Sequence, residues 1–267
     1  MTYSKNSDFP IPYGKFVPKK KKPTPENVRN TNRRHPWMPA WLQSGIGGKS
    51  TAEVAASKTD SPPDVASTKT RLVAWFVSNC NTASRREDFV KELREHVDVD
   101  IYGSCGEFDC PRAKEAECLG MLTDHYKFYL SFENSVCRDY VTEKFWRILS
   151  ETTAVPIVLG GGDYAKDAPP NSLVNVFNFS SPHRLASFLQ LLDTHDHLYN
   201  EFHSWRRDYD AIFDVAHNDA WCQLCKALNE EDPRPKWYEN IDEFWSEENN
   251  CVVTNAKDFY QTQGKDG

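Results

Sequence analysis

The sequence predicts an α/β fold in which helices flank a Rossmann-like, mostly parallel β-sheet. Apolar runs rich in Val, Ile and Phe recur along the chain, as in residues 71–77 (RLVAWFV) and 155–162 (VPIVLGGG). Amphipathic stretches separate these runs, as in residues 85–97, where Phe89 and Leu93 fall on one helical face and the charges on the other. Strands that alternate with helices form right-handed βαβ units, which build a parallel sheet.

The predicted elements follow one another between residues 71 and 209. Thr142 is the expected N-cap of one helix, and in another Ser181 precedes Pro182, which suits a first helical position. These signals fix where the loops between strands and helices lie. Strands are expected over residues 71–77, 98–103, 128–134, 155–162 and 173–179, and helices over residues 85–97, 142–151, 181–192 and 195–209.

The segments on either side of this region differ from it in composition. Residues 1–17 mix aromatic residues with Pro and predict an ordered, extended segment. Residues 18–70 are first basic and then rich in Ser, Thr, Gly and Pro, which predicts a low-complexity linker or insertion. Its KKKK run lacks a neighbouring aromatic or amphipathic pattern, which favours a solvated linker over a nucleic-acid or membrane patch. Residues 229–267 are predicted to form a C-terminal tail.

Length and composition exclude several classes of protein. The 267 residues suffice for one large or two small domains, and a net charge of −7 argues against a general nucleic-acid binder. No apolar run reaches the length of a membrane-spanning helix, and no signal peptide is visible at the N-terminus. The eight cysteines favour an oxidising compartment with disulfides, which conflicts with the missing signal peptide.

Three loops follow predicted strands and should meet at one edge of the sheet, where ligands of such folds bind. They span residues 78–86, 134–144 and 160–164. Cations together with the start of the helix at Thr142 predict a site for a phosphate or pyrophosphate. The side chains that these loops offer are Arg85 or Arg86, Asn134, Arg138, Tyr140 and Lys144.

Two carboxylates lie among these cations. Because Glu133 and Glu143 would repel a phosphate, they are better suited to bind the hydroxyls of a sugar or ribose. Neither GxGxxG nor GxxxxGK[ST] occurs, which disfavours a standard NAD dehydrogenase and a P-loop NTPase. A nucleotide-sugar site fits the pattern better, because such donors combine a diphosphate with hydroxyl-rich ends.

Residues 127–160 carry a specific pattern: Phe-x-x-x-Phe-Glu-Asn-Ser, then Asp-Tyr-x-Thr-Glu-Lys, then a strand that ends in Leu-Gly. This pattern closely resembles the donor-binding motif of the α1,3-fucosyltransferases, in an arthropod-like form. Residues 73–103, 163–193 and 199–209 are also similar to that family. Residues 1–14 resemble the short segment that joins its two domains.

The resemblance implies a two-domain glycosyltransferase of the GT-B type, with residues 71–228 as its C-terminal, GDP-fucose-binding half. Site residues are implied by position. Arg86 and Lys144 would hold the donor phosphates, Tyr140 and Asn134 would line the nucleotide pocket, Glu143 would accept hydrogen bonds from ribose, and Glu133 would contact the fucose side.

The family reaction is inverting: an acceptor hydroxyl attacks fucose C1 as GDP leaves. The resemblance implies GDP-fucose as donor, a GlcNAc-containing glycan or glycoprotein as acceptor, and no nucleic-acid partner. The family reaction requires no metal in principle, because the cations stabilise the leaving diphosphate. Stimulation of the reaction by Mn²⁺ or Mg²⁺ is compatible with the resemblance. Asp98 and Asp100 have DxD spacing but fall in a predicted strand, so we do not expect a metal site there.

In the family, the acceptor domain, the general base and a membrane anchor precede the segment resembled by residues 1–14. The resemblance therefore predicts that this chain is an incomplete gene product or gene model, with no catalytic base assigned. The full-length form would be a type II membrane protein facing the Golgi lumen. The alternative hypothesis is a fragment that binds the donor without catalysing transfer.

Three further sequence features remain. Cys222 and Cys225 form a CxxC pair without a second pair for zinc, and similarity to the family favours a structural disulfide there. His195 and His197 are interpreted as a polar helix start rather than a metal cluster. Asn178 begins a glycosylation sequon (Asn-Phe-Ser) and is expected to point outward from its strand.

Overall fold

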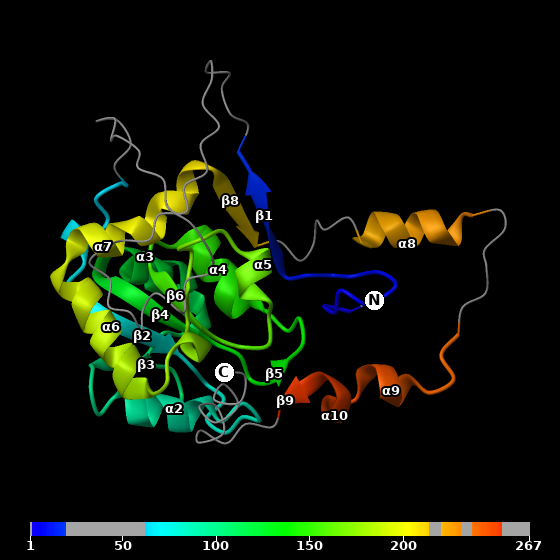
Figure 1. The fold of residues 1–267 in the computed structure, drawn as a ribbon, viewed down its shortest axis with the longest axis horizontal. Coiled ribbons are helices and arrows are strands. Elements are labelled where there is room, and N and C mark those ends of the chain that lie inside the picture. The colour runs from blue at the N-terminus through cyan, green and yellow to red at the C-terminus, as the bar shows by residue number, and fades with distance from the viewer. Residues whose placement is uncertain (1, 20–61, 214–219, 231–236, 253–267) are drawn as a thin grey trace, which may run out of the picture.

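The computed structural model describes residues 2–19, 62–213, 220–230 and 237–252, and a five-stranded parallel sheet lies at its centre (Figure 1). The strand order is β3-β2-β4-β6-β7, and each neighbouring pair is parallel. Because β2 lies between β3 and β4, the chain crosses over the sheet in both directions from β2, as in a doubly wound fold. The strands are β2 (Arg71–Phe76), β3 (Val99–Tyr102), β4 (Tyr126–Phe132), β6 (Val155–Leu159) and β7 (Val174–Asn175).

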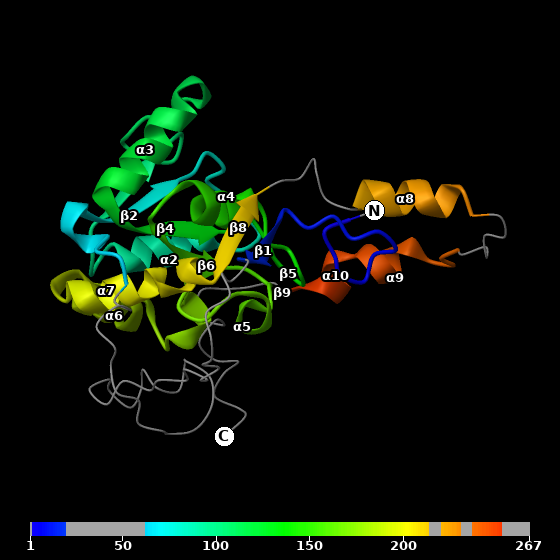
Figure 2. The ribbon, with the colours of Figure 1, turned by 90° about the horizontal axis from the view of Figure 1, so that it is seen from above.

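Helices cover both faces of the sheet (Figure 2). One face packs against α2 (Arg86–Leu93), α6 (Pro182–Thr194) and α7 (Asp196–Asn200), and the other against α3 (Glu115–His125) and α4 (Glu143–Glu151). Successive side chains of a strand point to opposite faces. Val73 and Trp75 of β2 accordingly join the first core, whereas Ala74 between them joins the second.

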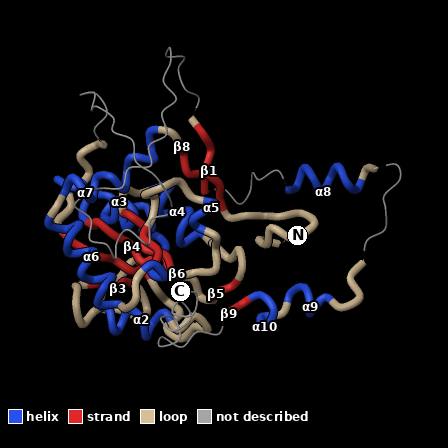
Figure 3. Tube along the Cα trace, viewed as in Figure 1, coloured by secondary structure: helices blue, strands red, loops and turns tan. Residues whose placement is uncertain are grey.

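A two-stranded antiparallel ribbon packs outside α4, apart from the central strands (Figure 3). It pairs β1 (Gly14–Pro18) with β8 (Tyr209–Phe213). Gly14 leaves room for the Trp146 indole of α4, since a Cβ at this position would lie 2.4 Å from Trp146 Cδ2. The ribbon therefore fastens the N-terminal segment to the helix that carries the predicted site.

The C-terminal part of the chain runs beside the N-terminal segment (Figure 1). It contains α8 (Ala220–Leu228), α9 (Ile241–Trp245), α10 (Glu247–Asn250) and β9 (Cys251–Val252), and β9 pairs with β5 (Val136–Cys137). The remaining short elements are α5 (Tyr164–Asp167) and 3₁₀ turns at Ala66–Thr68, Arg112–Lys114, Val176–Asn178 and Glu201–Arg207.

The α/β prediction is confirmed, with differences in three elements. The strand expected over 173–179 stops at Asn175, because the Asn175 side chain accepts a hydrogen bond from Phe177 N at 3.0 Å and starts a 3₁₀ turn. The helix expected over 195–209 ends at Asn200, and a 3₁₀ turn and β8 follow. Helix α3 was not predicted.

The predicted linker over 18–70 differs at its end, and residues 20–61 lie outside the described residues. Ala66 is buried, and Asn200 Oδ1 accepts hydrogen bonds from Val65 N and Ala66 N, both at 3.0 Å. Residues 65–68 therefore pack against α7 as part of the folded domain.

Three disulfides are present: Cys80–Cys105, Cys110–Cys118 and Cys137–Cys251. The expected bond at Cys222 and Cys225 is not formed, and both thiols are free and exposed. These two cysteines lie three residues apart on α8, where Cβ atoms are about 5–6 Å apart. A disulfide needs a Cβ separation of roughly 3.5–4.5 Å, which is shorter than this helical spacing.

His203 makes the folded state sensitive to acid. Its imidazole is buried beside Tyr199, and neither ring nitrogen has a hydrogen-bond partner among the described residues. Burial, together with the nearby Arg206 and Lys69, lowers its pKa from 6.5 to about 3. Below pH 6.5 the unfolded chain therefore binds a proton that the folded chain does not, and stability falls by up to ~1.4 kcal/mol per pH unit.

Replacement of His203 should remove this acid sensitivity. We expect His203→Phe to flatten the pH dependence of the unfolding free energy between about pH 6.5 and 4, measured by urea denaturation at several pH values. His183→Phe, at an exposed position on α6, is the control and should keep the wild-type slope. If His203→Phe loses stability on acidification as steeply as wild type, His203 is not the responsible group.

Candidate functional site

The three loops predicted to converge do so at the carboxyl edge of the sheet. Ser84 links the first two, because its N–H donates to Asn134 O at 2.9 Å and its hydroxyl to Glu133 O at 2.7 Å. The second and third loops meet where Asp139 N donates to Gly161 O at 3.1 Å. A Cβ on Gly161 would lie 2.1 Å from Cys137 O, so only glycine permits this approach. Hydrogen bonds thus join the three loops at this edge of the sheet.

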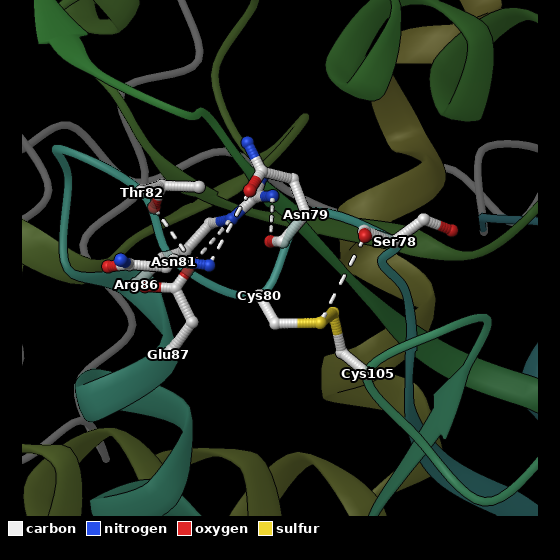
Figure 4. The surroundings of a disulfide bond; sticks show 8 residues. All are labelled: Ser78, Asn79, Cys80, Asn81, Thr82, Arg86, Glu87 and Cys105. Carbon is white, nitrogen blue, oxygen red and sulfur yellow. Dashed lines mark hydrogen bonds and ion pairs between the residues drawn. A yellow bond between two sulfur atoms is a disulfide. The ribbon is translucent and has the colours of Figure 1, made fainter.

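Arg86 begins α2 and points back to the ends of the strands (Figure 4). Its guanidinium donates to Phe132 O at 2.7 Å and to Asn79 O at 3.1 Å, and Nε lies 3.6 Å from Glu87 Oε1. The Cys80–Cys105 disulfide fastens this loop to the residues that follow β3. Arg85 instead pairs with Asp88 on the exposed side of the helix. Of the two arginines left open by the sequence, Arg86 is the one at the sheet edge.

Glu133 organises the start of α4. Its carboxylate accepts hydrogen bonds from Thr142 N and from Thr142 Oγ1, each at 2.7 Å, and Lys144 Nζ lies 3.3 Å away. Thr142 is the N-cap as predicted, but its hydroxyl is turned toward Glu133 rather than toward the helix backbone. Burial raises the pKa of the Glu133 carboxyl, while Lys144 and the Thr142 donors oppose that effect.

Glu133, predicted to contact the fucose side, is held by the start of α4. The side chain is fully buried. Because both of its oxygens are used by Thr142, it acts by positioning the helix start and Lys144. Sequence reasoning missed this role, since an acid at a strand end gives no sign of the donor that it will meet nine residues later.

Lys144 is held by three oxygens. Its ammonium donates to Thr142 Oγ1 at 2.9 Å and to Glu143 Oε1 at 3.0 Å, in addition to the contact with Glu133. Burial lowers the pKa of Lys144, but Glu133 and Glu143 together outweigh burial, and the pKa is raised overall. Lys144 is 22% exposed and Glu143 44% exposed, so this pair is the part of the cluster that a ligand can reach.

Asn134 and Tyr140 flank the same cluster. Asn134 Oδ1 is buried without a hydrogen-bond partner among the described residues. An unpaired buried polar atom is costly and commonly marks a place for a ligand or water. The Tyr140 ring is half-buried and packs against Tyr3, with the ring centroids 4.9 Å apart. All six residues predicted for the donor site therefore lie along one edge.

Other predicted features lie elsewhere. Asn178 is exposed at the end of a 3₁₀ turn, as a glycosylated residue must be. Asp100 accepts hydrogen bonds from Arg71 and Tyr126. The described residues contain no group of three or more His, Cys, Asp or Glu side chains placed to bind a metal ion. No helix among these same residues has the length and apolar content that crossing a bilayer requires.

Comparison with known proteins gives one consistent result. Residues 66–245 match the sequence model of the family described as glycosyltransferase family 10 (fucosyltransferase) C-term. Glycoprotein 3-alpha-L-fucosyltransferase A of Drosophila melanogaster is 40% identical over 72% of this chain and 38% of its own length. Alpha-(1,3)-fucosyltransferase fut-1 of Caenorhabditis elegans is 39% identical over 66% of this chain and 42% of its own length.

A human relative and a solved structure extend the comparison. Alpha-(1,3)-fucosyltransferase 4 of Homo sapiens is 33% identical over 90% of this chain and 39% of its own length. The chain thus spans between 38% and 42% of the length of these three curated relatives. A crystal structure of an alpha1,3-fucosyltransferase aligns with a TM-score of 0.43 at 28% identity, over 51% of this chain and 37% of the other.

Proposed function

The chain belongs to glycosyltransferase family 10, the fucosyltransferases, and we propose that its sheet edge binds GDP-fucose for transfer to the 3-hydroxyl of GlcNAc in a glycan. The observation that carries this proposal is the cluster of Lys144, Glu143 and Glu133 at the start of α4, next to Arg86. The matched family model describes the C-terminal part of these enzymes, which supports a two-domain GT-B arrangement.

The diphosphate would replace Glu143 as a partner of Lys144. All three donors of the ammonium are already engaged, and Glu143 is the most exposed of their acceptors. A phosphate oxygen offers Lys144 a stronger charge-assisted hydrogen bond. Glu143 is then free to accept hydrogen bonds from the ribose hydroxyls. The exchange of Glu143 for a phosphate oxygen thereby accounts for the two roles that the family resemblance implies: Lys144 holds the phosphate and Glu143 binds the ribose.

The base of the nucleotide would be read by Asn134. Its buried Oδ1 lacks a donor among the described residues, and guanine carries an amino group that uracil lacks. A site with an unpaired polar group discriminates strongly against a ligand that leaves it unpaired. The half-buried ring of Tyr140 offers an apolar surface beside this group.

The proposed reaction is an in-line displacement with inversion at fucose C1. The acceptor oxygen forms the new bond to C1 while the bond from C1 to the GDP oxygen breaks, and the hydroxyl proton passes to a base. Lys144 and Arg86 would stabilise the negative charge that develops on the leaving diphosphate. Among the described residues we assign no side chain as that base. Under this proposal no metal is required, and Mn²⁺ or Mg²⁺ would act only as a stimulant.

The proposed location is the Golgi lumen, as expected of enzymes that modify glycans. Three disulfides support an oxidising compartment, because such bonds seldom persist where thiols are kept reduced. The exposed sequon at Asn178 is consistent with passage through the same compartments.

A transfer assay tests the proposed activity. The chain is incubated with GDP-fucose and N-glycans that present either the core or an antennal GlcNAc, and product is detected by mass spectrometry and its linkage by NMR. We expect an α1,3-linked fucose with inverted C1 configuration. Binding of GDP-fucose without product on either acceptor would favour the alternative, a chain that holds the donor but does not transfer it.

A further inference from the structure

A cavity of about 410 Å³ lies beside the donor edge, and the proposed donor role does not account for it. Three segments that are distant in sequence line it: residues 3–6, residues 135–140 and residues 243–251. Figure 2 shows the N-terminal segment passing next to α9 and α10. Tyr140 is the residue that this cavity shares with the donor site.

The walls of the cavity are fastened together. The Cys137–Cys251 disulfide and the pairing of Val136 with Val252 attach the C-terminal segment to the donor loop. Arg138 N donates to Asn250 O at 2.8 Å. These links hold the second wall against the third.

The N-terminal wall is attached to the other two. Lys5 N donates to Asp139 Oδ2 at 3.1 Å, and Tyr238 OH donates to Asp8 Oδ2 at 2.9 Å. A disulfide and several hydrogen bonds therefore join the three segments, so the shape of the cavity is set by the fold.

Aromatic rings line one side of the cavity. Tyr3 lies between Tyr140 and Trp245, with ring centroids 4.9 Å and 5.3 Å away, and Phe244 stacks on Trp245. Trp245 is 44% exposed despite its size. A row of partly exposed rings offers flat apolar area with polar tips, which suits the C–H face of a sugar ring.

The polar lining favours a neutral ligand with many hydroxyl groups. Two carboxylates, Glu243 and Glu247, face a single guanidinium, Arg138, which leaves the lining with a net charge of −1. Coulomb repulsion therefore disfavours a phosphate or another anion. Carboxylates accept hydrogen bonds from hydroxyls, and the amide of the lining residue Asn6 offers both donors and an acceptor.

We propose that this cavity binds a neutral sugar residue, with Trp245 as its stacking platform and Glu247 as a hydroxyl acceptor. Because Tyr140 borders both sites, the sugar belongs to the glycan that accepts fucose; this identification rests on the proposed function. The cavity then places part of the acceptor next to the donor while GDP-fucose is bound.

Saturation-transfer NMR titrations with N-acetylglucosamine test the proposal on the whole chain, with and without saturating GDP. We expect saturable binding in both conditions. Trp245→Ala should raise the dissociation constant at least tenfold, whereas Trp237→Ala, an exposed tryptophan of the same segment outside the lining, should leave it unchanged. Glu247→Gln should weaken binding more than Glu248→Gln, which alters a neighbour that does not line the cavity.

Several outcomes would overturn the proposal: no saturable signal, equal losses in the two tryptophan variants, or a signal that GDP abolishes, which would place the sugar in the donor site. GDP binding is measured by calorimetry on the same samples. If the wild-type chain does not bind GDP, only the proposed function is contradicted. The sugar titration without GDP then still shows whether the cavity binds a sugar.

Discussion

Lys144→Ala should weaken GDP binding by about 1.5–3 kcal/mol, the range for a hydrogen bond to a charged group. This corresponds to a rise in the dissociation constant of roughly 10- to 150-fold. The reason is that Lys144 is the partly exposed cation at the start of α4, where the diphosphate is proposed to lie. Isothermal titration calorimetry at one fixed ionic strength measures the effect, since exposed charges are screened by salt.

The matched control is Lys91→Ala, which removes a positive charge from the exposed side of α2. It should leave GDP affinity within error of wild type. A Lys144→Arg variant keeps a cation beside Glu133 and keeps the test informative if the alanine variant is poorly folded. Unchanged affinity in a folded Lys144→Ala protein would refute the placement of the diphosphate.

Glu133→Ala should lower the free energy of unfolding by about 1–3 kcal/mol, the cost of leaving a buried hydrogen-bonding group without its partner. The carboxylate is fully buried and accepts two hydrogen bonds from Thr142, so its removal leaves both Thr142 donors without this acceptor and takes one of three acceptors from the Lys144 ammonium. Urea denaturation measures the loss as a shift in midpoint at constant m-value.

Two variants sharpen this second test. Glu133→Gln keeps an acceptor for Thr142 but removes the charge, so it should cost less than Glu133→Ala. Glu92→Ala alters an exposed acid on α2 and should change stability by less than about 0.5 kcal/mol. If Glu133→Ala proved as stable as Glu92→Ala, the carboxylate would not hold the start of α4.

Local patterns were sufficient to predict the elements that build the donor edge. Helix α4 begins after Thr142 and α6 after Ser181, as their capping residues indicate, and strand β2 follows its apolar run. Because parallel strands end at one edge, the three loops had to converge, and the hydrogen bonds of Ser84 and Asp139 show that they do. The position of Lys144 followed from these local signals and from the family motif.

Long-range pairings were beyond sequence reasoning. Strand β1 joins β8 across almost the whole folded domain, and neither segment alone has the alternation of a core strand. Eight cysteines allow 105 complete pairings, so the bond from Cys137 to Cys251 had no local signal. The prediction of residues 229–267 as a C-terminal tail missed α10 and β9, which this bond holds against the donor loop.

Calorimetric titration of the whole chain with GDP-fucose, GDP-mannose and a UDP-sugar tests the central claim, that the edge around Lys144 and Asn134 is a GDP-fucose site. We predict saturable binding of GDP-fucose at one site per chain, displacement by GDP, weaker binding of GDP-mannose, and at least tenfold weaker binding of the UDP-sugar, which lacks the guanine amino group proposed to pair with Asn134 Oδ1. No binding of GDP-fucose, or equal affinity for the UDP-sugar, would contradict this assignment.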